Sequence, residues 1–208
     1  MNEIDFMRAA NCSAADGDTW FPLFVSAFEE FGITDRLDRA MIIGLSSSET
    51  DRFRKLSETF NYSSGALRRE FGTRFSPYQA AMLGFQMLEK EIPLERQIAI
   101  ANLAYGGRMG NGAREGYTYR ARGVLPIRGK KVYKEASELV GVDFVAAPDS
   151  VADPRLAVRI ACAMFTARSC SGIEATIEVV ERLQLDPHDE KDTRRGLAVR
   201  RARAELPK

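Results

Sequence analysis

Histidine, cysteine and long apolar runs are all scarce in this chain of 208 residues, and each shortage excludes a class of function. The one histidine, His188, stands in the segment Asp-Pro-His-Asp-Glu, which predicts a solvated turn or helix start rather than a catalytic base. Cys12, Cys162 and Cys170 show no spacing typical of metal ligands, so we expect three free thiols and no metal site. No apolar run approaches the roughly 20 residues of a membrane-spanning helix, so we expect no stable membrane insertion.

Net charge is also nearly absent, because 30 basic residues face 29 acidic ones and leave a formal charge of +1. A balance this even does not favour a nucleic-acid partner. Locally, basic residues gather in residues 114–134 and again in residues 194–203. We expect the second group to form a solvated helix face. The first group lies in a glycine-rich stretch and is a candidate contact surface for an anionic polymer or an acidic protein.

Apolar residues recur at helical spacing along most of the chain and strand patterns are scarce, so the predicted fold class is mainly α. Residues 106–129 are polar and rich in glycine, which predicts a long loop with at most a short β-hairpin. We expect residues 1–208 to form one domain that can divide into two lobes around this loop. Helices are predicted at about residues 18–31, 36–48, 63–71, 76–89, 93–105, 130–141, 153–168, 172–184 and 189–204.

Two carboxylates are candidates for acid–base chemistry because of where they fall along the chain. Glu49 closes the apolar helix predicted at 36–48, and Glu58 follows an irregular turn nine residues later. Inverting glycoside hydrolysis uses one carboxylic acid to protonate the leaving oxygen and one carboxylate to activate water, with roughly 6.5–9.5 Å between them. Among 29 acidic residues many pairs have this spacing, so surface charges or helix caps remain the alternative.

A more specific signal lies in residues 98–123, IAIANLAYGGRMGNGAREGYTYRARG. They resemble the pattern Y-x-x-R-M-G-N…G-x-x-Y-R-G-R-G of the chitinase-like phage endolysins of glycoside hydrolase family 19. Residues 53–63 resemble that family's F-x-x-L-x-E-N-x-N-Y-S segment. The resemblance extends without large gaps over about residues 1 to 170, including 18–34, 93–97 and 153–165.

The resemblance implies a lysozyme-like helical fold whose two lobes flank a groove. It also implies hydrolysis of the β-1,4 links of peptidoglycan or chitin with inversion, without a cofactor or a metal. Glu49, in the place of the Glu of the family's H-E-S-G-G-F, would be the general acid, and Glu58 the general base. The residues expected to bind substrate are Tyr62, Tyr105, Arg108, Asn111, Tyr119, Arg120, Arg122 and Arg128.

The beginning of the chain bears on where such a protein would act. Residues 1–13 hold two acids before the first base and no continuous apolar segment, unlike a secretory signal. We therefore expect synthesis in the cytoplasm, with action at the cell wall or in the periplasm after release by lysis or injection.

The chain also departs from the family pattern. Ser48-Glu49-Thr50-Asp51-Arg52-Phe53 replaces H-E-S-G-G-F, and we expect Arg52 beside Glu49, where its charge would oppose proton donation. Pro126, Arg128 and Val132 stand where the family has polar residues that contact sugar or help hold the attacking water. The alternative function is therefore a catalytically impaired relative that binds a glycan or a protein partner.

Overall fold

The structure of the protein, a computed structural model, describes residues 1–185 and 189–207, so the prediction for His188 lies outside the described residues. Strand pairing in the described part is limited to isolated bridges of Arg122 with Ser57 and with Ile127. Helices account for the rest of the regular structure, which confirms the mainly helical fold class. Over the same residues, no helix combines the length and the apolar character needed to cross a bilayer.

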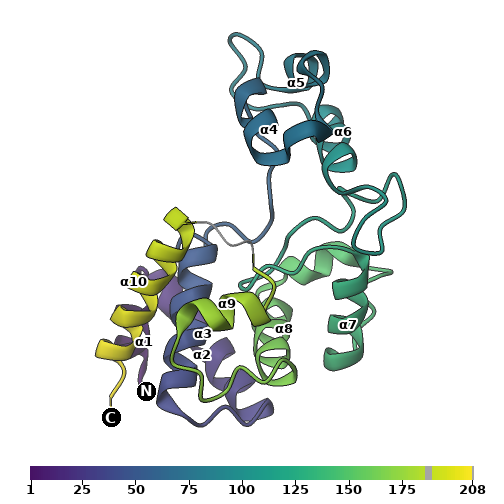
Figure 1. Ribbon diagram of the computed structural model, residues 1–208. Helices are drawn as coiled ribbons and strands as arrows, with labels where there is room; N and C mark the ends of the chain where they lie inside the picture. Colours follow the sequence, from purple (N-terminus) through teal and green to yellow (C-terminus); the bar gives the residue numbers. More distant parts are fainter. Residues whose placement is uncertain (186–188, 208) are drawn as a thin grey trace.

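The buried apolar side chains form two clusters, which define a large lobe and a small lobe (Figure 1). The helices of the large lobe are α1 (Glu3–Ala10), α2 (Ala14–Glu30), α3 (Arg36–Glu49), α7 (Lys130–Val140), α8 (Pro154–Ala167), α9 (Thr176–Arg182) and α10 (Asp189–Glu205). Those of the small lobe are α4 (Ser64–Phe71), α5 (Pro77–Leu83) and α6 (Leu94–Tyr105). Short 3-10 helices lie at Gly72–Arg74 and Pro148–Ala152.

Local sequence explains where several helices begin. Ser13 and Asp16 form a capping box at the start of α2, and Ser76 and Gln79 form another before α5. Asp153 accepts a hydrogen bond from a backbone N–H in the first turn of α8. Helical periodicity did not predict α1, which has only eight residues.

Two predicted helices are shorter in the structure. The helix predicted to continue to Glu89 ends at Leu83, because Gly84 adopts an extended backbone. The N–H of Phe85 then donates to the carbonyl oxygen of Tyr62 (3.0 Å), which directs the chain back toward α4. Similarly, α9 begins four residues after the predicted residue 172, behind a glycine turn.

The three cysteines are free thiols, as predicted. Cys162 is fully buried in α8, and burial raises its thiol pKa strongly. Burial also raises the pKa of the Cys12 and Cys170 thiols to about 11. Thiolate formation at neutral pH is therefore suppressed at all three positions.

The chain crosses between the lobes twice, and the two crossings are hydrogen-bonded to each other. Residues 57–59 lead into the small lobe, and residues 117–121 lead back to the large lobe. The N–H of Glu58 donates to the carbonyl oxygen of Ala121 (2.9 Å). This pairing fixes the backbone of Glu58 at the junction of the lobes.

Candidate active-site cleft

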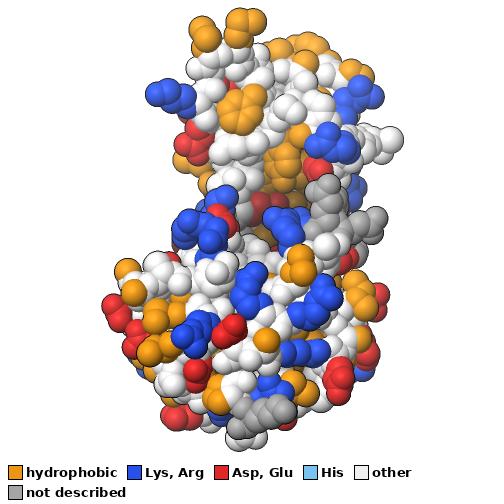
Figure 2. Space-filling model, turned by 90° about the vertical axis from the view of Figure 1, so that its left-hand side faces the viewer, with side chains coloured by type: hydrophobic (Ala, Val, Ile, Leu, Met, Phe, Trp, Pro, Cys, Tyr) orange, Lys and Arg blue, Asp and Glu red, His pale blue; other side chains and the backbone are white. Residues whose placement is uncertain are grey.

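A cleft lies between the lobes and contains both candidate carboxylates. It consists of two adjoining cavities of about 440 and 450 Å³, which share Glu58, Tyr62, Arg128 and Lys191 in their walls. Glu49 lines the first cavity. Figure 2 shows the hollow at the waist of the molecule, with acidic side chains inside it and basic side chains on both sides. The structure therefore brings the two carboxylates into one space.

Glu49 is the last residue of α3, and α3 packs closely against α10. A Cβ atom at Gly44 would lie only 2.7 Å from the Cα of Val199, so glycine is what permits this approach. The close packing places Arg195, one turn before Val199, against the end of α3.

Arg195 is fully buried and binds two carboxylates at once. Its Nε donates to Oε1 of Glu49 (2.5 Å), and its Nη1 donates to Oδ1 of Asp192 (2.7 Å). Burial lowers the pKa of Arg195, but the hydrogen bonds to the two carboxylates outweigh this effect, so the pKa is raised overall. The guanidinium is therefore a permanent charge beside Glu49.

Glu58 is held by a different set of donors. The hydroxyl of Tyr105 donates to its Oε1 (2.8 Å), and the backbone N–H of Ala121 donates to its Oε2 (3.1 Å). Arg128 lies above the ring of Tyr105, 4.7 Å from its centroid, with Nε 3.5 Å from Oε2 of Glu58. Burial and the nearby Glu58 charge raise the pKa of Tyr105, so its hydroxyl stays protonated and can donate.

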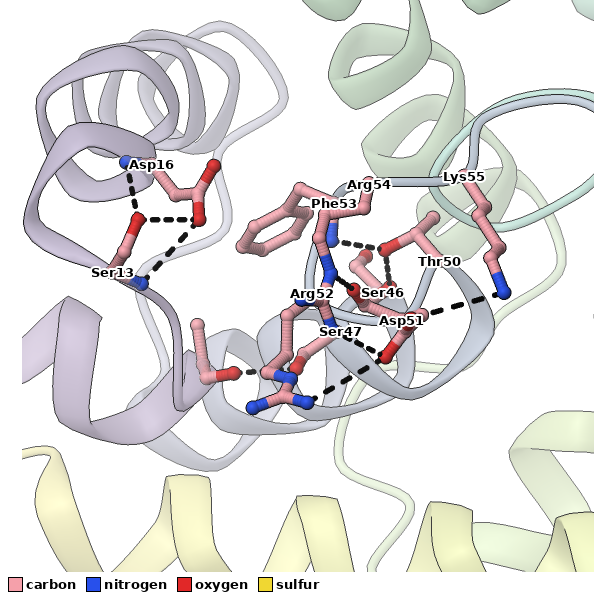
Figure 3. Close-up of polar contacts among 11 residues, drawn as sticks. Ser13, Asp16, Ser46, Ser47, Thr50, Asp51, Arg52, Phe53, Arg54 and Lys55 are labelled. Atoms are coloured by element: carbon pink, nitrogen blue, oxygen red, sulfur yellow. Dashed lines mark hydrogen bonds and ion pairs between the residues drawn. The ribbon is translucent and has the colours of Figure 1, made fainter.

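The expectation that Arg52 lies beside Glu49 is wrong. Asp51, Arg52 and Phe53 adopt φ angles of 50°, 61° and 66°, a left-handed turn outside the cleft, and the chain lines the cleft again from Lys55. Figure 3 shows the guanidinium of Arg52 turned toward Asp51, at 3.7 Å, on the surface of the large lobe. Phe53 enters the core and stacks on Trp20 with ring centroids 4.8 Å apart. The guanidinium that meets Glu49 comes instead from α10.

Four of the predicted substrate-binding residues lie on the cleft: Tyr62, Tyr105, Arg108 and Arg128. Arg120 lies at a neighbouring hollow on the other side of residues 57–59, where its guanidinium stacks on the ring of Tyr117 at 4.1 Å. Arg120 can therefore contact a ligand in the cleft only if that ligand extends beyond residues 57–59.

The structure does not bring the other three predicted side chains to the cleft surface. The amide of Asn111 donates to the Tyr105 carbonyl oxygen and accepts from the Lys130 N–H, both inside the protein. The hydroxyl of Tyr119 donates to the Val145 carbonyl oxygen (3.3 Å). Arg122 borders the cleft, but its guanidinium is buried and donates to Tyr133 and Asp149. These groups hold residues 106–129 in place.

Sequence reasoning missed several residues that face the cleft or its carboxylates. Lys55, Gln184 and Lys191 line the first cavity, and Arg195 contacts Glu49. Arg195 lies 146 positions from Glu49 in the sequence, so no local pattern links the two. Its other partner, Asp192, is three residues away on the same helix, and Asp–Arg pairs at this spacing are common on helix surfaces. Nothing in the sequence distinguishes this arginine from its neighbours on α10.

A mainly helical body of two lobes with acidic side chains in the cleft between them has the architecture of a lysozyme-like domain. No family model matches the chain. The chain is 30% identical to a glycosyl hydrolase family 19 domain-containing protein of Haemophilus influenzae, over 127 residues that make up 60% of this chain. The match covers 58% of that relative, so the chain spans less than two thirds of its length. This similarity supports a glycosidase-like family.

Proposed function

We propose that the protein hydrolyses the β-1,4 links of an amino-sugar glycan, peptidoglycan or chitin, with Glu49 as general acid and Glu58 as general base. The observation that carries this proposal is that both carboxylates line one open cleft between the lobes. Their side chains are 14% and 12% exposed, so each is enclosed but reaches the cavity. Inversion needs two carboxyl groups on opposite sides of the scissile bond, with room for water between them.

The surroundings of Glu58 suit a general base. Tyr105 and the Ala121 N–H occupy one lone pair on each oxygen and fix the orientation of the carboxylate. Since a carboxylate oxygen can accept more than one hydrogen bond, a lone pair remains for an attacking water. The protein therefore positions the base before the substrate arrives.

Glu49 can be protonated without leaving the Arg195 guanidinium unpaired, because Arg195 has a second partner in Asp192. Glu49, Arg195 and Asp192 together carry one negative charge when both acids are ionised. Protonation of Glu49 leaves Arg195 paired with Asp192, so no buried charge is left uncompensated. Glu49 can then donate its proton to the leaving oxygen while Arg195 holds the side chain in place.

The charge on the rims of the cleft favours an anionic glycan. Lys55, Arg108 and Lys191 are cations on its walls, in addition to Arg128 beside Glu58. Peptidoglycan carries carboxylates and chitin does not, so within this proposal peptidoglycan is the preferred substrate.

A second function, glycan binding without hydrolysis, is favoured by one specific observation. Each candidate carboxylate lies beside a guanidinium, Glu49 beside Arg195 and Glu58 beside Arg128. A guanidinium occupies lone pairs of the carboxylate that it contacts, and these lone pairs would otherwise carry the donated proton or accept from the attacking water. In this alternative, the same cleft holds the glycan chain and the carboxylates serve only to bind it.

One experiment separates the two functions. Purified protein is incubated with peptidoglycan sacculi and with chitooligosaccharides, and the release of reducing ends is measured for the wild type, Glu49→Gln and Glu58→Gln. We expect release by the wild type and a loss of about 10²–10⁴-fold in both variants. Glu95→Gln, on the exposed start of α6, is the matched control and should not change the rate. Binding of sacculi without release supports the second function, and neither binding nor release contradicts both.

A further inference from the structure

Of the basic residues expected to form a solvated face in residues 194–203, Arg194, Arg200 and Arg201 are exposed on α10, whereas Arg195 is buried. Four of the seven cations of residues 114–134 have partners within the chain, in the pairs Arg120 with Tyr117, Arg122 with Asp149, Arg128 with Glu58 and Lys130 with Glu115, whereas Lys131 and Lys134 are exposed on α7. A basic contact surface in this run therefore stays a prediction. A separate exposed basic surface lies on α10 and the turn after α3.

This surface contains a depression of about 530 Å³ on the large lobe, outside the cleft. We call it the basic depression. Its walls carry four cations, Arg52, Lys55, Arg194 and Arg201, and the single carboxylate of Asp51. Polar groups complete the lining: Asn11, Ser47 and Ser48. The depression therefore has a surplus of positive charge and hydrogen-bond donors.

The cations of the depression are only partly neutralised by the protein itself. Asp51 is shared among Arg54 at 2.9 Å, Arg52 at 3.7 Å and Lys55 at 3.9 Å, as Figure 3 shows for Arg52 and Lys55. Arg194 and Arg201 make no ion pair with any described residue. These two arginines are seven residues apart on α10, about 10 Å along one face of the helix.

The basic depression is continuous with the cleft on one side. Lys55 lines both, and Lys191, one turn of α10 before Arg194, lines the cleft. On the other side, Arg52 and Arg54 line an adjoining hollow. Figure 2 shows basic side chains spread over this face of the large lobe up to the waist of the molecule. The positive charge therefore forms a strip rather than a single point.

We propose that the basic depression binds an extended polyanion that carries phosphate groups and lies along the large lobe toward the cleft. Guanidinium groups pair with phosphate oxygens in a bidentate geometry, and cations about 10 Å apart match a chain of repeated anionic groups better than one small ion. The surface does not suit a lipid bilayer, because it is hollow and Leu197 is the one large apolar side chain in its lining. This proposal is independent of glycan hydrolysis.

Binding of short-chain polyphosphate to the full chain tests the proposal, measured by isothermal titration calorimetry at low and at high salt. We expect binding that weakens with salt, and a decrease of about tenfold or more in affinity for the double variant Arg194→Glu/Arg201→Glu. The matched control is Lys131→Glu/Lys134→Glu on the exposed face of α7, which changes the net charge equally and should retain most of the affinity.

Three results would overturn the proposal. The first is the absence of polyphosphate binding by the wild type. The second is an equal loss of affinity in both double variants, which would mean that net charge alone decides binding. The third is binding to phosphatidylglycerol vesicles without binding to polyphosphate, which would assign the surface to a membrane. Circular dichroism of each variant confirms that the exposed substitutions leave the fold intact.

Discussion

The two carboxylates of the cleft are held in opposite ways. The Glu58 carboxylate accepts hydrogen bonds from Tyr105 of the small lobe and from the backbone N–H of Ala121 at the lobe junction. The Glu58 N–H in turn donates to the carbonyl oxygen of Ala121. Glu49 is held by one buried guanidinium from α10, 146 positions away in the sequence. The position of Glu58 thus depends on the lobe junction, whereas that of Glu49 depends on how closely two helices of the large lobe pack. Changes to one set of contacts should therefore leave the other largely intact.

The largest expected effect comes from the guanidinium of Arg195. Arg195→Leu leaves Glu49 and Asp192 without their buried partner, and we expect the free energy of unfolding to fall by about 3–5 kcal/mol. Urea denaturation measures this loss. Arg195→Lys keeps the charge without the fork of donors and should lose less. An unchanged stability in Arg195→Leu would show that the ion pair does not hold α10 against α3.

The close packing of α3 on α10 gives the next largest effect. Gly44→Ala places a Cβ atom 2.7 Å from the Val199 backbone, and we expect a loss of about 1–3 kcal/mol in the free energy of unfolding. The matched control is Gly196→Ala in α10, where a Cβ atom meets nothing within 4 Å. Because alanine favours a helix more than glycine does, this control should gain up to about 1 kcal/mol. Equal effects of the two substitutions would contradict the packing argument.

At Glu58, removal of one hydrogen bond should have a moderate effect that is confined to the junction. Tyr105→Phe deletes the 2.8 Å bond and keeps the ring beneath Arg128. We expect a loss of about 1 kcal/mol in stability and, in the hydrolysis assay, a rate reduced by about tenfold with α3 and α10 unaffected. Since the Glu49 contacts are independent, the combination with Arg195→Lys should be additive in stability. A strong coupling between the two substitutions would show that the two carboxylates form one network.

The smallest effect concerns the left-handed turn after Glu49. Arg52 has a φ angle of 61°, which costs a non-glycine residue roughly 1 kcal/mol, and its side chain is 46% exposed. Arg52→Gly should therefore raise the free energy of unfolding by about 0.5–1 kcal/mol. The comparison is Arg54→Gly, two residues on, where φ is not positive and no gain is expected. Destabilisation by Arg52→Gly would mean that the side chain of Arg52 supports the turn.

Much of the fold could be predicted from local signals. The ends of α3, α4 and α6 follow from helical periodicity and from capping or helix-ending residues such as Asp35, Ser63 and Gly106. The predicted end of the helix at Glu89 was wrong because Gly84 leaves the helix, and the N–H of Phe85 then makes a tertiary hydrogen bond that no local pattern encodes. Local patterns therefore predicted which segments form helices better than they predicted where each helix ends.

The candidate site was predictable only in part. The resemblance placed Glu49 and Glu58 in one groove, and the structure has both in one cleft. The neighbour of Glu49 could not be predicted, because contact of α10 with α3 brings Arg195 there, while the left-handed turn carries Arg52 away. Residues close in sequence are not the ones that meet the carboxylate.

The central claim, that Glu49 and Glu58 act across one cleft with a water between them, is tested most directly by the anomeric form of the first product. Proton nuclear magnetic resonance of a β-1,4-linked oligosaccharide during early hydrolysis distinguishes the two outcomes. Inversion predicts that the α-anomer appears first. Initial release of the β-anomer, or no product at all from either glycan, would contradict the claim.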